Sequence, residues 1–245
     1  MRRRAAASVF SALLGAAFTW SVASLQGCSG PSMGEDDNTF PKGGGGADAS
    51  AEAGETDAPQ GATMVTRTPD AAPLPGESEC KVVEVSGIPV ASGRHLDVCT
   101  AIDPATNPPS GGEHWPVWAR YAEYTAPVPR EMYIHNLEHG GVVITYRCKD
   151  PCPELVAALE GVFADATDPY CATMSPPTPR LVLTPDANIP TPIAASAWHA
   201  TYTATCLDPA SLKNFIQSNI GQGSEMVCGG GVDPAAIIAS CGGSK

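Results

Sequence analysis

The pattern of apolar and polar positions divides residues 80–245 into short strands and amphipathic helices. A continuous apolar run at 142–146, directly after two glycines, predicts a buried strand. Shorter apolar runs predict further strands, at 81–85, 95–98, 181–183 and 197–204. Helical spacing and Pro at the first helical position predict helices over 153–165, over 208–221 and from 233 onward. The alternation predicts an α+β domain.

A further helix is predicted over residues 129–139, between Pro129 and the stop at Gly140. At about 100° per residue, one side of this helix is entirely polar and the other is apolar. The polar side consists of Glu131, His135, Glu138 and His139. Histidines at positions i and i+4 lie one turn apart, which is the spacing that binds one metal ion.

The run from His135 to His139 also has the H-x-x-E-H form of the inverzincin peptidases. In that interpretation the two histidines bind zinc and Glu138 is the general base. The third ligand is then a later glutamate, and the sequence does not distinguish Glu154, Glu160 and Glu225. A third interpretation is that both histidines are partly buried and bond to loop backbone.

Residues 1–27 have the form of a secretory signal, with Arg2 to Arg4 before a short apolar stretch. The end of this stretch, residues 25–28, resembles the lipobox of bacterial lipoproteins, so Cys28 is the expected lipidation site. The alternative is an ordinary secreted signal with Cys28 as a stray thiol. A lipidated Cys28 predicts a membrane-anchored protein outside the cytoplasm, in the periplasm or on the cell surface.

Residues 28–79 are rich in Gly, Ala, Pro and acidic residues and contain one aromatic residue, Phe40. Such a composition buries too little apolar surface to offset the entropy of ordering, which predicts a disordered tether. The whole chain has a formal net charge of -12. This acidity argues against nucleic acid as a partner, because no basic stripe is available for phosphates.

The domain predicted at 80–245 contains an even number of cysteines. In an exported protein they predict four disulfides, whose pairing the sequence does not give. The alternative, a cysteine-ligated zinc, lacks the usual paired C-x-x-C spacing. The eight are Cys80, Cys99, Cys148, Cys152, Cys171, Cys206, Cys228 and Cys241.

Four motifs follow one another along the domain: residues 93–95, 108–114, 124–131 and 135–146. In this order they resemble the domain of unknown function 3105 (DUF3105), found largely in secreted or membrane-anchored bacterial proteins. The resemblance runs from about residue 93 to residue 220 and implies no known reaction. Two positions depart from it, since Ala122 and His199 stand where the family usually has Gly. His199 is therefore the weakest candidate ligand.

The residues shared with that family are His95, His114, His135, Glu138 and His139. Burying several imidazoles with a carboxylate is costly without a common partner, and imidazole-rich sites suit copper or zinc. Aromatic residues at every third position from Trp115 to Tyr124 are expected to pack in the core or to wall this site. A sugar-binding or protein-docking surface is their alternative role.

The leading hypothesis is a binding module for a transition metal, copper or zinc. Its ligands are His135 and His139 with His114 and His95, and Glu131 and Glu138 are supporting residues around them. The alternatives are a metal-assisted hydrolase with Glu138 as general base, and a disulfide-stapled surface protein without metal. A binding role is favoured over an enzyme.

Overall fold

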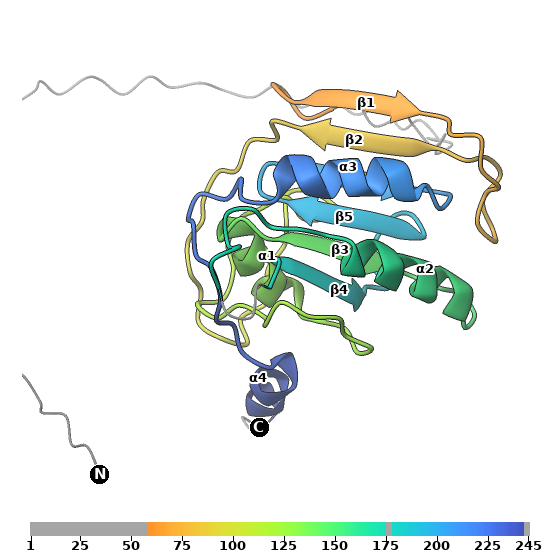
Figure 1. Cartoon of the computed structure of the whole chain (residues 1–245). Helices are drawn as coiled ribbons and strands as arrows, with labels where there is room; N and C mark the ends of the chain where they lie inside the picture. Colours follow the sequence, from red (N-terminus) through yellow and green to blue (C-terminus); the bar gives the residue numbers. More distant parts are fainter. Residues whose placement is uncertain (1–57, 175–177, 243–245) are drawn as a thin grey trace, which may run out of the picture. The chain divides into compact units, whose positions relative to one another are not determined.

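The computed structural model describes residues 58–174 and 178–242. This part of the chain forms one six-stranded mixed sheet with four helices, so the α+β class is confirmed. The strand order is β1-β2-β6-β5-β3-β4, and only β3 and β4 run parallel (Figure 1). The strands are β1 (Thr63–Arg67), β2 (Val82–Ser86), β3 (Val142–Tyr146), β4 (Leu181–Pro185), β5 (Ile193–Ala197) and β6 (Ala200–Ala204).

The sheet begins earlier in the chain than the sequence predicted. Strand β1 pairs antiparallel with β2, with Thr63 opposite Ser86, so the expected domain boundary at residue 80 is too late. Strand β1 lies at the edge of the sheet and is mostly exposed, so it carries little apolar signal against the polar segment around it. The predicted signal, Cys28 and residues 28–57 of the predicted tether lie outside the described residues.

The helices begin and end close to their predicted bounds. They are α1 (Arg130–Glu138), α2 (Pro153–Ala164), α3 (Pro209–Asn219) and α4 (Pro234–Cys241). Strand β3 has the predicted bounds. Two strand predictions are wrong in detail, because residues 95–98 contribute one isolated bridge and residues 197–204 turn at Trp198 and His199 between β5 and β6.

The two faces of the sheet are covered by different helices. Val142 and Ile144 of β3 face one core cluster, which includes residues of α2 and α3. Val143 lies between them and faces a second cluster, built around α1. Because side chains alternate along a strand, β3 is buried on both faces, which explains its uninterrupted apolar run.

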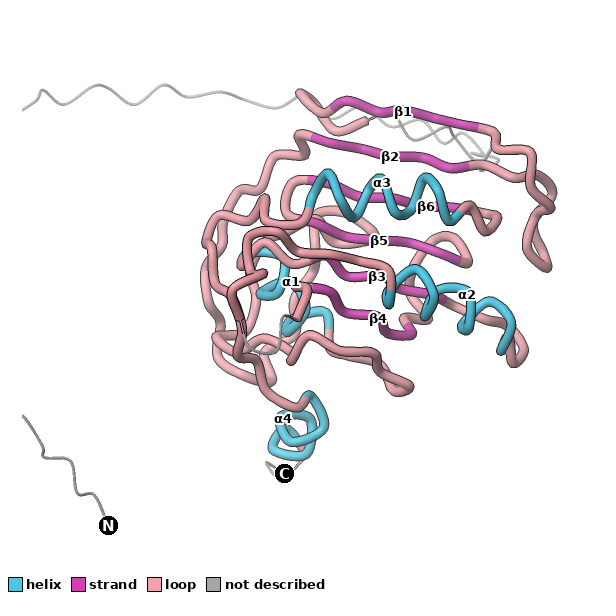
Figure 2. The backbone as a smooth tube through the Cα atoms, viewed as in Figure 1, coloured by secondary structure: helices cyan, strands magenta, loops and turns pink. Residues whose placement is uncertain are grey.

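Between β2 and α1 the chain runs through residues 87–129 without a helix or an extended strand (Figure 2). The disulfide Cys99–Cys241 ties this irregular segment to the end of α4. The other disulfides are Cys80–Cys206, Cys148–Cys152 and Cys171–Cys228, so all eight cysteines of the domain are paired. Among the described residues, no helix combines the length and apolar character needed to cross a bilayer.

Candidate metal centre

Helix α1 is buried on all its sides rather than only on its apolar side. Every residue from Met132 to Glu138 is buried, and His139, which caps the helix, is 2% exposed. The apolar side packs against β3, and the polar side faces the irregular segment 87–129. A side of a helix that carries only His and Glu is therefore enclosed by protein.

The irregular segment brings two more histidines to this side of α1. His95 and His114 form an isolated parallel bridge, in which the Leu96 N–H donates to the His114 carbonyl at 2.7 Å. The imidazole rings of His95, His114 and His135 lie 4.7 to 4.8 Å apart, measured between ring centres. His114 and His135 are buried, whereas the His95 side chain is 47% exposed.

Backbone carbonyls set the orientation of the two buried rings. The Nδ1 of His114 lies 2.7 Å from the Gly112 carbonyl, and the Nδ1 of His135 lies 2.7 Å from the Trp115 carbonyl. Because a carbonyl oxygen can only accept, each Nδ1 carries the hydrogen. In the neutral ring the Nε2 then carries a lone pair, which is the arrangement commonly seen in metal-binding histidines.

The carboxylate of Glu138 faces the Nε2 atoms of His114 and His95. Its Oε2 lies 3.0 Å from the Nε2 of His114 and 3.5 Å from the Nε2 of His95. A lone pair pointing at a carboxylate is unfavourable unless a cation or an extra proton lies between them. Ligand atoms of His95, His114, His135 and Glu138 all lie within 4.8 Å of one another. Metal bonds of about 2.0–2.2 Å place the ligand atoms of a tetrahedral ion about 3.3–3.6 Å apart, which is close to the 3.0 and 3.5 Å between Glu138 and the two imidazoles.

His139 belongs to a second, overlapping group. Its Nε2 lies 3.2 Å from the Nε2 of His135 and 3.3 Å from the Oε2 of Glu225. The second group of potential ligands is Glu138, His139 and Glu225, again within 4.8 Å of one another. The two groups therefore share Glu138.

Burial keeps the α1 histidines neutral. It lowers the pKa of His135 to about 3, against an opposing effect of the hydrogen bond to Trp115. Burial also lowers the pKa of His139, although the carboxylates of Glu225 and Glu138 counteract it. Neutral imidazole is the form that binds metals, so both side chains are ready to act as ligands at neutral pH.

The sequence-predicted residues divide between these two groups. His95, His114 and His135 come together as expected, but Glu138 rather than His139 completes their group. Glu131 is in neither group, and its carbonyl accepts a hydrogen bond from the Trp115 N–H. Of the three glutamates weighed as a further ligand, Glu225 lies beside His139, whereas Glu154 and Glu160 are on α2, which covers the opposite face of the sheet.

His199 lies apart from both groups. Its Nδ1 is 2.7 Å from the Ile88 carbonyl, and its side chain is exposed. Its φ angle of 65° is in the left-handed region, a backbone conformation that glycine adopts more readily than histidine. This position agrees with the prediction that His199 is the weakest candidate ligand.

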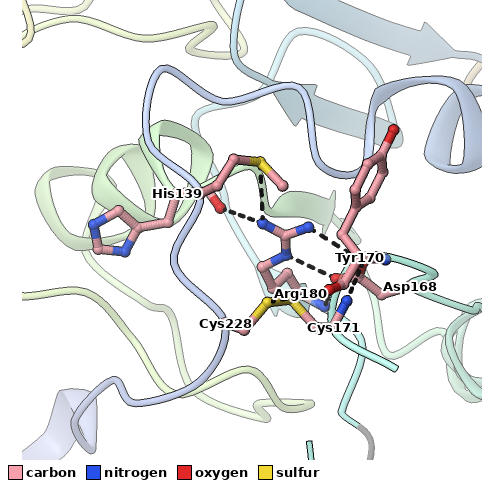
Figure 3. The surroundings of a disulfide bond; sticks show 7 residues. His139, Asp168, Tyr170, Cys171, Arg180 and Cys228 are labelled. Carbon is pink, nitrogen blue, oxygen red and sulfur yellow. Dashed lines mark hydrogen bonds and ion pairs between the residues drawn. A yellow bond between two sulfur atoms is a disulfide. The ribbon is translucent and has the colours of Figure 1, made fainter. Parts of the chain in front are cut away.

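Arg180 stabilises the C-terminal end of α1, and no sequence pattern predicted this role. Its guanidinium is fully buried, forms an ion pair with Asp168 at 2.7 Å and donates to the His139 carbonyl at 2.8 Å. Figure 3 shows this carbonyl directed at Arg180 and the His139 ring directed away from it. The neighbouring disulfide Cys171–Cys228 joins the segment of Asp168 to the segment that follows Glu225.

The predicted aromatic stripe is not helical, but its residues do pack around the site. Trp115 and Tyr121 are buried in the α1 core cluster. The ring of Trp118 lies 4.4 Å from that of His139 and 5.1 Å from that of His135, measured between centres. These side chains exclude water from the α1 side of the cluster.

The fold and the site together define a disulfide-bonded α+β domain with a buried His and Glu cluster. Residues 95–229 match the family described as "Protein of unknown function (DUF3105)", and the chain belongs to this family. The matched region includes every residue of the two ligand groups. No curated protein and no solved structure matches the chain.

Proposed function

We propose that this protein is a transition-metal-binding module that holds copper or zinc through His95, His114, His135 and Glu138. The observation that carries the proposal is the position of the His114 ring. Its Nδ1 faces a carbonyl and its Nε2 faces the Glu138 carboxylate at 3.0 Å, and the His114 side chain is fully buried. A cation bound between these groups removes the conflict between the lone pair and the carboxylate.

The donor set favours binding over hydrolysis. A general base needs a carboxylate that is free to take a proton from water, whereas Glu138 Oε2 is directed at two imidazoles. Three imidazoles and one carboxylate fill the four positions that zinc prefers. The exposed side of His95 gives an ion a route in and out.

The proposal includes the location of the protein. Four disulfides indicate an oxidising compartment outside the cytoplasm. We propose that the protein is anchored there as a lipoprotein by a lipid on Cys28, which requires no spanning helix. Cell fractionation tests the anchor: Cys28→Ala is expected to leave the membrane fraction, and retention after carbonate extraction would contradict it.

Elemental analysis of the purified, disulfide-bonded protein tests the metal site. We expect stoichiometric copper or zinc in the wild type, release by a chelator and uptake again on dialysis. His114→Asn keeps a donor for the Gly112 carbonyl but removes the Nε2 ligand, so it is expected to lose the metal. Its matched control is His199→Asn, which makes the same exchange outside the cluster and is expected to keep the metal.

Two results would overturn the proposal. One is a wild-type protein that takes up neither copper nor zinc after chelation and dialysis. The other is equal metal content in His114→Asn and the wild type. If His114→Asn fails to fold, His95→Asn provides the same test, because the half-exposed His95 side chain is outside the core.

A further inference from the structure

Glu225, His139 and Glu138 form a second ligand group beside the proposed metal site. Their ligand atoms lie within 4.8 Å of one another, and the His139 Nε2 is 3.3 Å from the Glu225 Oε2. His139 itself is 2% exposed, and its Nδ1 is buried with no hydrogen-bond partner in the described part of the chain. This ring is therefore held in place by packing, and only its Nε2 edge meets polar groups.

A single ion does not account for both groups. The Nδ1 hydrogen of His135 is donated to the Trp115 carbonyl, so the single lone pair of this ring is on Nε2. His135 belongs to the first ligand group. His139 lies 3.2 Å from that Nε2 but is not within 4.8 Å of all the other ligand atoms of the first group. As a ligand, His139 would therefore serve a different ion.

Glu138 is placed to serve both groups. Its Oε2 faces His114 and His95, whereas its Oε1 accepts a weak hydrogen bond from the Ser224 hydroxyl at 3.5 Å. Ser224 is the residue before Glu225. One oxygen of the carboxylate thus faces the first group, and the other faces the segment that carries the second.

The segment 221–225 is fitted closely to the end of α1. The Gly221 N–H donates to the Gly140 carbonyl at 2.7 Å, and the Glu225 N–H donates to the Glu138 carbonyl at 2.9 Å. A Cβ on Gly223 would lie 2.1 Å from the Glu138 carbonyl oxygen, so only glycine allows this approach. Glu225 is thereby held at the helix end by its own backbone, although its side chain is 56% exposed.

Charge also favours a cation here. Glu138 and Glu225 contribute two carboxylates, and the C-terminal end of α1 adds the negative pole of the helix dipole. Arg180 contacts this helix end through the His139 carbonyl, and its charge is paired with Asp168, away from the His139 ring (Figure 3). Imidazole with carboxylates suits divalent zinc and its neighbours in the first transition row.

We propose that His139, Glu225 and the shared carboxylate of Glu138 hold a second divalent transition-metal ion, so that the centre binds two ions bridged by Glu138. This inference rests on the proposed function, because the first ion must be present for Glu138 to act as a bridge. The second site is open to solvent through Glu225, whose side chain is 56% exposed.

Zinc counting at a fixed free concentration tests the proposal on the full-length, disulfide-bonded protein. The chelator-stripped protein is dialysed against buffered zinc, and bound zinc is measured against protein. We expect two ions per chain in the wild type and one in Glu225→Gln, which keeps the size of the side chain and removes its charge. The matched control, Glu154→Gln, changes an exposed glutamate of α2 and is expected to keep two ions.

The outcomes separate the two proposals. One zinc ion in the wild type and one in Glu225→Gln would overturn the second site and leave the first intact. No zinc or copper in any variant would overturn both. Two ions in both the wild type and Glu225→Gln would also overturn the assignment, because Glu225 would then not be a ligand.

Copper(II) provides an independent readout. Two-metal sites with shared ligands place their ions about 3.5–4 Å apart, close enough for the unpaired electrons to interact. The electron paramagnetic resonance spectrum of the fully loaded wild type is expected to be broadened or weakened, and Glu225→Gln is expected to give an isolated-ion spectrum. An isolated-ion spectrum from the wild type at two copper ions per chain would contradict the shared centre.

Discussion

Both faces of the sheet are covered by helices, but the side chains that the helices bury differ in kind. On one face, α2 and α3 cover the sheet with apolar residues such as Leu159 and Phe215. On the other face, α1 is buried all round, and three of its buried or capping residues are His135, Glu138 and His139. The first face is an ordinary hydrophobic core, and the second contains groups that are unfavourable to bury.

The burial of polar groups lowers the stability of the protein on the α1 face of the sheet. Buried polar groups normally have partners, and Asn136 on α1 has two, the N–H and the carbonyl of Ala119, at 3.0 and 2.7 Å. The Nδ1 of His139 has no hydrogen-bond partner among the described residues, and the Nε2 atoms of the cluster meet only one another and carboxylates. Local departures of this kind are expected at functional sites.

Removal of Arg180 is expected to be the most damaging change on the α1 face. Arg180→Met leaves the Asp168 carboxylate buried without its partner and removes the donor to the His139 carbonyl. We expect a loss of about 3–5 kcal/mol in the free energy of unfolding, measured by urea denaturation. The matched control is Lys213→Met, which breaks an exposed ion pair with Asp165 and is expected to cost under about 1 kcal/mol. Equal losses in the two variants would contradict a structural role for the buried pair.

Acid is expected to weaken the metal-free protein through His135. Burial lowers the folded-state pKa of His135 to about 3, whereas the unfolded imidazole binds a proton near pH 6.5. Between these values the unfolded state binds more protons, so stability falls as the pH falls from about 6.5 towards 3. The expected contribution is about 2–4 kcal/mol.

Comparison with His135→Asn isolates this contribution from that of the many carboxylates. The unfolding free energies of the two metal-free proteins are measured by urea denaturation from pH 7 to pH 4. The slope with pH is expected to be shallower in the variant. Identical slopes would show that the pKa of His135 is the same in the folded and unfolded states.

Metal binding is expected to stabilise the protein through the α1 face of the sheet, independently of the face that α2 and α3 cover. Leu159→Ala removes a fully buried side chain from the apolar face and is expected to lower stability by about 2–5 kcal/mol. This variant should still gain about 2.7 kcal/mol when the metal is in hundredfold excess over its dissociation constant. His114→Asn should lose that gain. Thermal unfolding with and without zinc measures both, and a metal-dependent gain that Leu159→Ala abolishes would contradict the independence of the two faces.

The sequence predicted the apolar face better than the site. Strand β3 and helices α2 and α3 have continuous or periodic apolar patterns, and Pro marks the start of both helices. Edge strand β1 was missed because only one of its faces contacts the domain and its side chains are mostly exposed. Hydrophobic periodicity in a sequence reflects which side chains are buried. An exposed edge strand buries few side chains, so its periodicity is weak.

The histidines were identified from spacing and family resemblance, but their grouping was not. A helix places His135, Glu138 and His139 on one side, yet which of them meets His114 depends on the path of the irregular segment. Glu225 reaches His139 only because the segment 221–225 docks on the end of α1. Such contacts join residues far apart in sequence and leave no periodic signal.

The smallest expected effect is at His199, the histidine outside both groups. His199→Gly relieves a left-handed backbone conformation, but it also removes the hydrogen bond to the Ile88 carbonyl and adds freedom to the unfolded chain. These effects oppose one another, so we expect a change within about 0.5 kcal/mol in unfolding free energy. His199→Val keeps a bulky side chain at the positive φ and is expected to be less stable by about 1–2 kcal/mol. Both variants should bind as much metal as the wild type in elemental analysis, and a loss of metal in His199→Gly would place His199 in the centre.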